Sequence, residues 1–234
     1  MRSVPMRDTQ AQIRVNSFIQ GVYNWMALGL GLTGLVAYFV AGSPALIQFI
    51  FGNMLIFFGL IIGQLALVYT ISSRVHKMEA STATKLFLFY AALNGATLAA
   101  VFLAFTASSI ASTFLICAAT FAACSIYGMT TKRDLTSLGG FMFMGLIGII
   151  IASVVNLFFR STAVMMIVSY LGVFIFIGLT AYDTQKLKTM AMTQPEGLDE
   201  GVIRKGSILG ALSLYLDFIN MFLFLLYIFG DSRN

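Results

Sequence analysis

The sequence predicts an all-α polytopic membrane protein, a bundle of seven transmembrane helices. Two observations lead to this prediction. First, 59% of the 234 residues are hydrophobic and only 10% are charged, whereas soluble domains are about half apolar and a quarter charged. Second, the apolar residues form seven runs of roughly 20 residues, which is the length that a helix needs to cross the hydrocarbon. We therefore expect one membrane domain whose main solvent is the lipid bilayer.

The seven runs follow one another with short connections. The first run, 21–41, is longer than the apolar core of a cleaved signal peptide, so we interpret it as a span. A softer stretch, 45–51, follows helix-breaking residues, and we expect it to cap the second span or to form an interfacial turn. The other predicted spans are 54–72, 86–106, 110–129, 138–158, 164–185 and 207–229. These boundaries predict a membrane domain at 21–229, between an N-terminal tail at 1–20 and a C-terminal tail at 230–234.

The basic residues predict how the chain is oriented. Twelve of the 14 Lys and Arg residues share one side of the membrane, and only Arg160 and Arg233 fall on the other. Because basic residues in short loops stay in the cytoplasm, we expect the N-terminus inside and the C-terminus outside. This topology accounts for the net charge of +5 without a nucleic-acid partner. The twelve residues are Arg2, Arg7, Arg14, Arg74, Lys77, Lys85, Lys132, Arg133, Lys186, Lys188, Arg204 and Lys205.

Several sequence signals bear on cofactors and location. No metal-ligand spacing, nucleophile elbow or phosphate loop occurs, so we predict neither a cofactor nor a metal site. The sequence has no lipidation signature and no glycosylation sequon, which fits a bacterial inner membrane. Gly59 and Gly63, and again Gly206 and Gly210, have the small-xxx-small spacing that lets helix backbones approach closely. We interpret these glycines as packing positions.

Asp217 lies where the bilayer penalises charge. It is the eleventh residue of the last apolar run, whereas nearly all other acidic residues lie in tails, loops or helix ends. A lone carboxylate there costs roughly 2.5 to 3.5 kcal/mol on insertion scales, so a compensating partner is expected. Ser213, four residues earlier, and Asn220, three residues later, share its helical face. We predict that this polar stripe faces the bundle interior; simple hydrogen bonding of Asp217 inside the bundle is the alternative.

Asp183 is the second candidate, at the cytoplasmic end of the sixth predicted span. If that helix continues beyond the run, Asp183 lies about one turn inside the boundary. Asp217 would then lie roughly 10 Å deeper, unless the last helix begins before it enters the bilayer. Two carboxylates that meet in a poorly hydrated site cannot both ionise cheaply, so such a pair would titrate as a unit. The alternative is that Asp183 is an ordinary helix-end residue that faces water.

Two segments resemble the paired signature of the Bax inhibitor family. They are Ala181-Tyr182-Asp183-Thr184-Gln185 and Leu212-Ser213-Leu214-Tyr215-Leu216-Asp217-Phe218-Ile219-Asn220. The resemblance implies a seven-helix bundle with the last helix central and a pH-sensitive calcium leak through it. It also implies that Asp183 and Asp217 form a two-aspartate proton sensor. Some bacterial members have an arginine that latches onto the sixth-span aspartate, and Arg74 is the nearest candidate here. The glutamate that such members can carry in the second span is missing from 54–72.

Three functions compete at this stage. The leading hypothesis is an ion-conducting protein whose aspartate pair opens or closes the pathway with pH, with calcium as the permeant ion. The resemblance also implies a regulatory alternative, because some bacterial relatives modulate a membrane-bound protease. An intramembrane aspartyl protease would need a Gly-x-Gly-Asp context, whereas Tyr215 and Leu216 precede Asp217. We therefore predict that the protein is not an enzyme.

Overall fold

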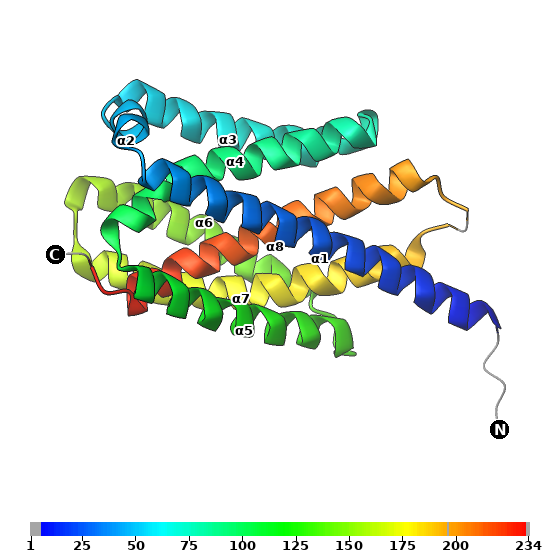
Figure 1. Cartoon of the computed structure of the whole chain (residues 1–234). Helices are drawn as coiled ribbons and strands as arrows, with labels where there is room; N and C mark the ends of the chain where they lie inside the picture. The colour runs from blue at the N-terminus through cyan, green and yellow to red at the C-terminus, as the bar shows by residue number, and fades with distance from the viewer. Residues whose placement is uncertain (1–5, 196, 233–234) are drawn as a thin grey trace. The chain divides into compact units, whose positions relative to one another are not determined.

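The computed structural model describes residues 6–195 and 197–232, with side chains from residue 13 onward. Arg2, Arg233 and the outermost residues of both predicted tails lie outside this part of the chain. The described residues form α1 (Met6–Ala41), α2 (Pro44–Phe51), α3 (Met54–Arg74), the 3-10 turn η1 (Val75–Lys77), α4 (Ala80–Ala104), α5 (Ala107–Thr130), α6 (Thr136–Phe159), α7 (Thr162–Thr193) and α8 (Glu200–Phe229) (Figure 1). Seven of these helices, all except α2, are long and apolar enough to cross a membrane. The all-α, seven-span prediction is confirmed.

The helices extend past the apolar runs that predict them. The α7 helix continues to Thr193 rather than ending near 185, and α8 begins at Glu200 rather than near 207. An apolar run marks only the part of a helix that suits hydrocarbon, whereas Lys, Arg and Glu at its ends are good helix formers. Half of the most apolar window of α8 is buried, a larger share than in any other described span.

The stretch after the first span is a short helix rather than a turn. Ser43 precedes α2 and its side chain accepts a hydrogen bond from the Leu46 N–H at 3.4 Å. Pro44 occupies the first turn, where its missing N–H costs nothing. Asn53 caps α3 in the same way, accepting from the Leu55 N–H at 2.9 Å. These two caps let the chain restart a helix twice within a few residues.

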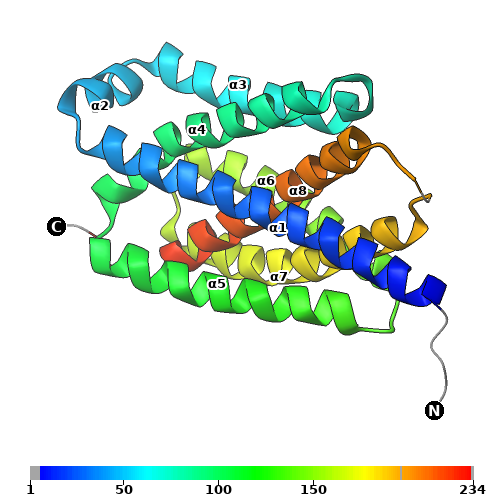
Figure 2. The same ribbon diagram turned by 45° about the vertical axis from the view of Figure 1, so that its right-hand side comes forward.

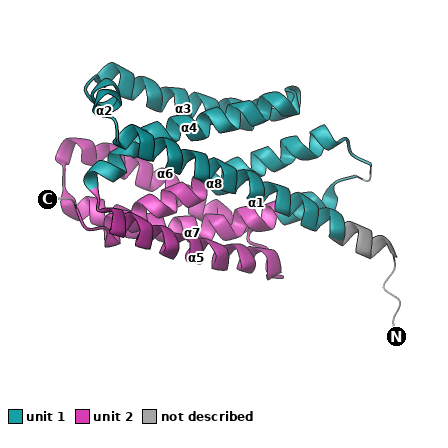
Figure 3. Ribbon diagram, in the orientation of Figure 1, with its two compact units in different colours: residues 1–104, 188–215 teal, residues 105–187, 216–234 magenta. Residues whose placement is uncertain are grey.

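The chain divides into two compact units, which Figure 3 colours separately. Unit 1 comprises Met1–Ala104 and Lys188–Tyr215, and unit 2 comprises Phe105–Leu187 and Leu216–Asn234. The α7 and α8 helices therefore each supply residues to both units.

Unit 1 is organised around a buried hydroxyl group. The α4 helix lies beside both α1 and α3 (Figures 1 and 2). The fully buried Tyr215 places its hydroxyl 2.6 Å from the Thr33 hydroxyl of α1 and 2.9 Å from the Asn94 amide nitrogen of α4, which donates to it. The Thr33 hydroxyl also donates to the Ala91 carbonyl at 2.8 Å. Side chains from three helices thus satisfy one another where water is excluded.

The glycine positions differ in how closely they are packed. A Cβ on Gly95 of α4 would lie 2.5 Å from the Thr33 carbonyl oxygen, so only glycine allows α1 and α4 to approach this closely. A Cβ on Gly206 would lie 3.2 Å from the Phe18 ring, which agrees with a packing position. A Cβ on Gly59 or Gly63 would meet nothing within 4 Å among the described residues. The prediction of close packing was therefore wrong for α3, because spacing alone does not say which face meets a neighbour.

Unit 2 packs its helices through small residues and aromatic rings. The Phe218 ring of α8 makes edge-on contacts with Phe114 and Phe121 of α5, at centroid distances of 5.4 and 5.5 Å. On α7, Gly178 lies against Met142 of α6. The end of α8 is tied to the start of α5, because the Thr106 N–H donates to the Asp231 carbonyl at 3.2 Å.

We predict that Tyr215→Phe destabilises the protein by about 1 to 3 kcal/mol, because Thr33 and Asn94 each lose a buried partner. The measurement is thermal unfolding of the purified protein in detergent. Tyr23→Phe is the matched control, because the Tyr23 hydroxyl is buried without a hydrogen-bond partner among the described residues. Its removal should leave stability unchanged or raise it. Equal stability of Tyr215→Phe and wild type would contradict the role given to the hydroxyl.

Candidate functional site

Asp217 is a buried carboxylate in unit 2. Only 5% of its surface is exposed, and its Oδ2 atom has no hydrogen-bond partner among the described residues. It lies in the interior of α8, where the helix backbone satisfies itself and has no free N–H to offer a side chain. An acidic group kept in such surroundings is expensive and points to a function.

Asp183 comes from α7 and interacts electrostatically with Asp217. The register of the two helices explains why. In unit 2 the Phe176 and Phe224 rings meet with centroids 6.0 Å apart, and the Phe224 ring also lies against Gly172. Asp183 follows Phe176 by seven residues, whereas Asp217 precedes Phe224 by seven residues. Because α7 and α8 are consecutive helices running in opposite directions, the same step of about two turns brings both carboxyl groups to one level.

The sequence allows the two carboxyl groups to share one depth if the last helix begins before it enters the bilayer. The structure meets that condition, because α8 begins at Glu200, before its apolar run. The structure thus brings the two predicted aspartates together.

Two glycines on neighbouring helices leave room for the turn of α7 that carries Asp183. A Cβ on Gly128 of α5 would overlap the Ala181 carbonyl oxygen and lie 3.0 Å from the Thr184 Cβ. A Cβ on Gly139 of α6 would overlap the Tyr182 ring. Neighbours from two helices therefore enclose residues 181–184, and only glycine leaves them room. These glycines escape notice in the sequence, because nothing there distinguishes them from the other 19 glycines.

Gln185 holds the connection between α5 and α6. Its side-chain oxygen accepts from the Leu135 N–H at 2.8 Å, and its amide nitrogen donates to the Arg133 carbonyl at 2.8 Å. One amide therefore satisfies two backbone groups of the 131–135 loop, two residues from Asp183. Gln185 belongs to one of the two family-like segments of the sequence. Its hydrogen bonds to the 131–135 loop could not be predicted there, because they join segments 50 residues apart.

The other predicted site residues are Ser213 and Asn220 on α8 and Arg74 on α3. Ser213 and Asn220 are half-buried, and the Asn220 amide donates to the carbonyl of Leu216 on its own helix at 2.8 Å. Arg74 is exposed and is the last residue of α3. Because Arg74 belongs to unit 1 and Asp183 to unit 2, the latch between them stays a prediction.

Few other charges occur in the described residues of unit 2. Lys186, three residues after Asp183, is exposed and places its ammonium 6.0 Å from the centre of the Tyr182 ring. Asp134 lies in the loop before α6 and accepts hydrogen bonds from the Thr136 hydroxyl at 2.6 Å and the Thr136 N–H at 2.9 Å. These bonds, the hydroxyl first, lower the pKa of Asp134, so it stays ionised at neutral pH. Asp134 therefore keeps its charge across the neutral range.

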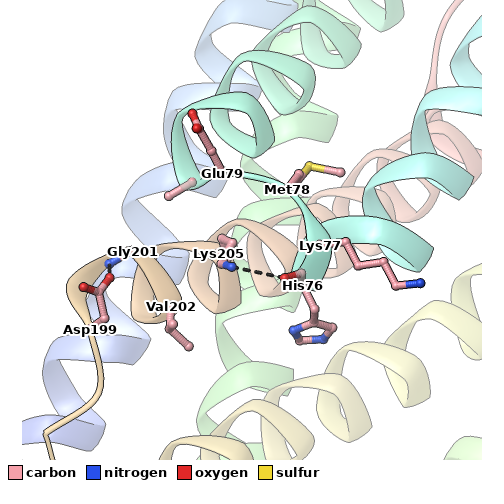
Figure 4. A pocket seen from close by; sticks show the side chains of 9 residues that line it. His76, Lys77, Met78, Glu79, Asp199, Gly201, Val202 and Lys205 are labelled. Carbon is pink, nitrogen blue, oxygen red and sulfur yellow. Dashed lines mark hydrogen bonds between the residues drawn. The ribbon is translucent and has the colours of Figure 1, made fainter.

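A polar pocket of about 430 Å³ lies in unit 1 at the start of α8 (Figure 4). The Lys205 ammonium donates to the His76 carbonyl at 3.3 Å, and the Asp199 carboxylate accepts from the Gly201 N–H at 2.7 Å. Both interactions tie the start of α8 to neighbouring backbone. The described residues contain no cluster of three or more His, Cys, Asp or Glu side chains that could hold a metal ion.

The family model described as inhibitor of apoptosis-promoting Bax1 matches residues 15–234. The chain belongs to the Bax inhibitor family. Its relatives include the inner membrane protein YbhL of Escherichia coli, 50% identical over the full length of both chains, and an uncharacterized protein of Borreliella burgdorferi, 44% identical over 97% of each. An uncharacterized protein of Deinococcus radiodurans is 40% identical over all of this chain and 98% of its own.

Family membership confirms the resemblance of the two aspartate-bearing segments. The seven apolar spans and the E. coli relative support a multi-pass protein of the inner membrane. The sides on which the two termini lie stay a prediction from the positions of the basic residues.

Gly139→Ala should displace the turn of α7 that carries Asp183, because the added methyl group meets the Tyr182 ring. We expect a loss of about 1 to 3 kcal/mol in thermal stability, as for overpacked cores. Gly140→Ala is the matched control on the next residue, since its Cβ would meet nothing within 4 Å. The control should match wild type or exceed it slightly, because alanine favours the helix. Equal unfolding temperatures for the two variants would refute the close packing of Gly139 against the Tyr182 ring.

Proposed function

We propose that this Bax inhibitor family member is a pH-sensitive ion-conducting protein, a calcium leak gated by Asp183 and Asp217. The observation that carries the proposal is the buried Asp217 carboxyl, which has an unpartnered oxygen and a second carboxyl, from the antiparallel α7, as its electrostatic neighbour. A structural carboxylate would be expected to have both oxygens satisfied.

The physical basis of gating is the charge state of the pair. Two carboxylates in a poorly hydrated site repel each other strongly when both are ionised, and one shared proton removes most of that repulsion. A change of about 1 to 3 kcal/mol between two helix arrangements shifts their populations roughly 5- to 150-fold. Uptake or loss of one proton therefore supplies enough free energy to open or close a path.

The surroundings leave the pair as the natural proton-sensitive group. The neighbouring α5 contributes the Cys117 thiol, which donates to the Phe218 carbonyl at 3.6 Å. The α7 helix contributes Asp183 itself and the exposed Lys186, whereas the described spans α5 and α6 carry no acidic or basic side chain. Carboxylate oxygens are also preferred ligands of Ca²⁺, so the same pair can attract the permeant ion.

The test measures calcium flux in vesicles that contain the purified protein, at several values between about pH 5 and 8. We expect wild-type flux to change with pH and Asp217→Asn to abolish the change, since an amide cannot titrate. Asp183→Asn should have the same effect, and the double variant should add little, because the carboxylates act as one unit.

Asp134→Asn is the control for a general loss of negative charge. Asp134 is exposed and ionised at neutral pH, and an asparagine oxygen can still accept the Thr136 hydrogen bonds. This variant should keep the wild-type pH response. Calcium flux that Asp217→Asn leaves unchanged, with no dependence on pH, would refute the proposal.

The regulatory alternative, modulation of a membrane-bound protease, makes a different prediction. It expects no calcium flux in vesicles and co-purification of a protease with the intact protein. Retention of that protease by wild type and its loss in Asp217→Asn would favour a regulatory role of the same pair.

A further inference from the structure

Several buried hydroxyl groups in this protein satisfy themselves. In an apolar helix a Ser or Thr side chain can donate to the carbonyl four residues earlier, without any partner from another helix. The buried Thr84, Ser169, Thr180 and Ser207 do so, at distances of 2.7 to 3.1 Å. At least four exposed hydroxyls do the same, those of Ser73, Thr130, Ser153 and Thr193.

Three buried Ser and Thr hydroxyls depart from this pattern, and all three belong to unit 2. The side-chain oxygens of Thr113 and Ser125 on α5 and of Thr184 on α7 have no hydrogen-bond partner among the described residues, and in unit 1 the Tyr23 hydroxyl has none either. The Ser109 carbonyl, four residues before Thr113, already accepts from the Ser112 hydroxyl at 3.2 Å. A buried hydroxyl that makes no bond to its own helix is suited to a ligand that protein atoms do not supply, such as water or a partly hydrated cation.

The unpartnered groups follow one face of α5. The buried positions of this helix recur every three or four residues: Ser109, Thr113, Cys117, Phe121, Ser125 and Gly128. Gly128 lies against Thr184, and Cys117 lies against Phe218, the residue after Asp217. Thr113 and Ser125 are twelve residues apart, roughly 18 Å along the helix, which is more than half of the hydrocarbon thickness.

Aromatic rings separate the two polar levels. Phe121 lies one turn from Ser125, and Phe114 follows Thr113 directly. Both rings contact the Phe218 ring of α8 edge-on. Polar, aromatic and again polar side chains therefore follow one another along this face of α5. This order is expected of a hydratable path that a hydrophobic constriction closes.

We propose that the buried face of α5 lines an internal hydrated path through unit 2, with Thr113 at one level, Ser125, Thr184 and Asp217 toward the other, and the Phe121–Phe218 contact as its constriction. The ligands of the path are water and a partly hydrated cation held by hydroxyl and carboxylate oxygens. The inference rests on the proposed conduction and names its route.

The test compares the reaction of cysteines with a charged methanethiosulfonate reagent. In a background carrying Cys117→Ala and Cys124→Ala, Ser125→Cys is compared with Ser169→Cys, and Thr113→Cys with Thr180→Cys. Ser169 and Thr180 are equally buried and bond to their own helix, so they are matched controls. We expect each α5 cysteine to react on the order of tenfold faster than its control, because thiol reactivity follows access to water. The reagent is applied to both sides of the vesicles.

Calcium flux provides a second and independent measurement. Phe121→Ala should raise flux several-fold at every pH, because it removes the constriction, whereas Ile149→Ala, at an equally buried apolar residue of α6, should not. Both variants truncate a large buried apolar side chain of unit 2, so a general loss of packing would affect them alike.

The outcomes separate the path from the proposed function. Fast reaction at Ser125→Cys and Thr113→Cys, with raised flux in Phe121→Ala, supports the path. Slow reaction at both α5 positions in a protein that conducts calcium overturns the path and leaves the proposed function intact. Fast reaction at both α5 positions, together with no calcium flux through the wild-type protein, supports the hydrated path and overturns calcium conduction instead.

Discussion

The constraint on which this structure depends is the scarcity of water around buried polar groups. Every N–H, C=O, hydroxyl and carboxyl inside the hydrocarbon must find a partner within the chain. Unit 1 meets this requirement by bringing the Tyr215, Thr33 and Asn94 side chains together from three helices. Thr84, Ser169, Thr180 and Ser207 meet it by donating to their own helix. Satisfied in these ways, polar residues hold helices in register at little cost.

Unit 2 leaves several buried polar groups without a partner among the described residues. Asp217 leaves one oxygen unpartnered, and Thr113, Ser125 and Thr184 do not use the carbonyls of their own helices. Selection for stability alone would favour apolar residues or self-satisfied hydroxyls at such positions. These unpartnered polar groups belong to the same unit in which the Asp183 and Asp217 carboxylates meet. A functional requirement for water or ions explains both features together.

The sequence predicts the spans well, because hydropathy reports directly what the bilayer accepts, and it predicts the burial of Asp217. It predicts helix ends less well, since charged residues at the interface continue a helix that has left the hydrocarbon, as at Thr193 and Glu200. The meeting of Asp183 and Asp217 depends on the contact of Phe176 with Phe224, which no local pattern encodes. Spacing likewise fails to separate the open Gly59 from Gly128, which a neighbouring helix covers.

The adjacency of Asp217 and Phe218 on α8 links the charge of the pair to the proposed constriction. Consecutive helix residues differ by about 100° in direction, so Asp217 interacts with α7 while Phe218 contacts α5. A shift of this part of α8 that relieves repulsion between the carboxylates must also move the Phe218 ring against Phe121. The two rings make a single edge-on contact with centroids 5.5 Å apart, which a small displacement would break. One helix segment can therefore convert the loss or gain of a proton into the opening or closing of an apolar barrier.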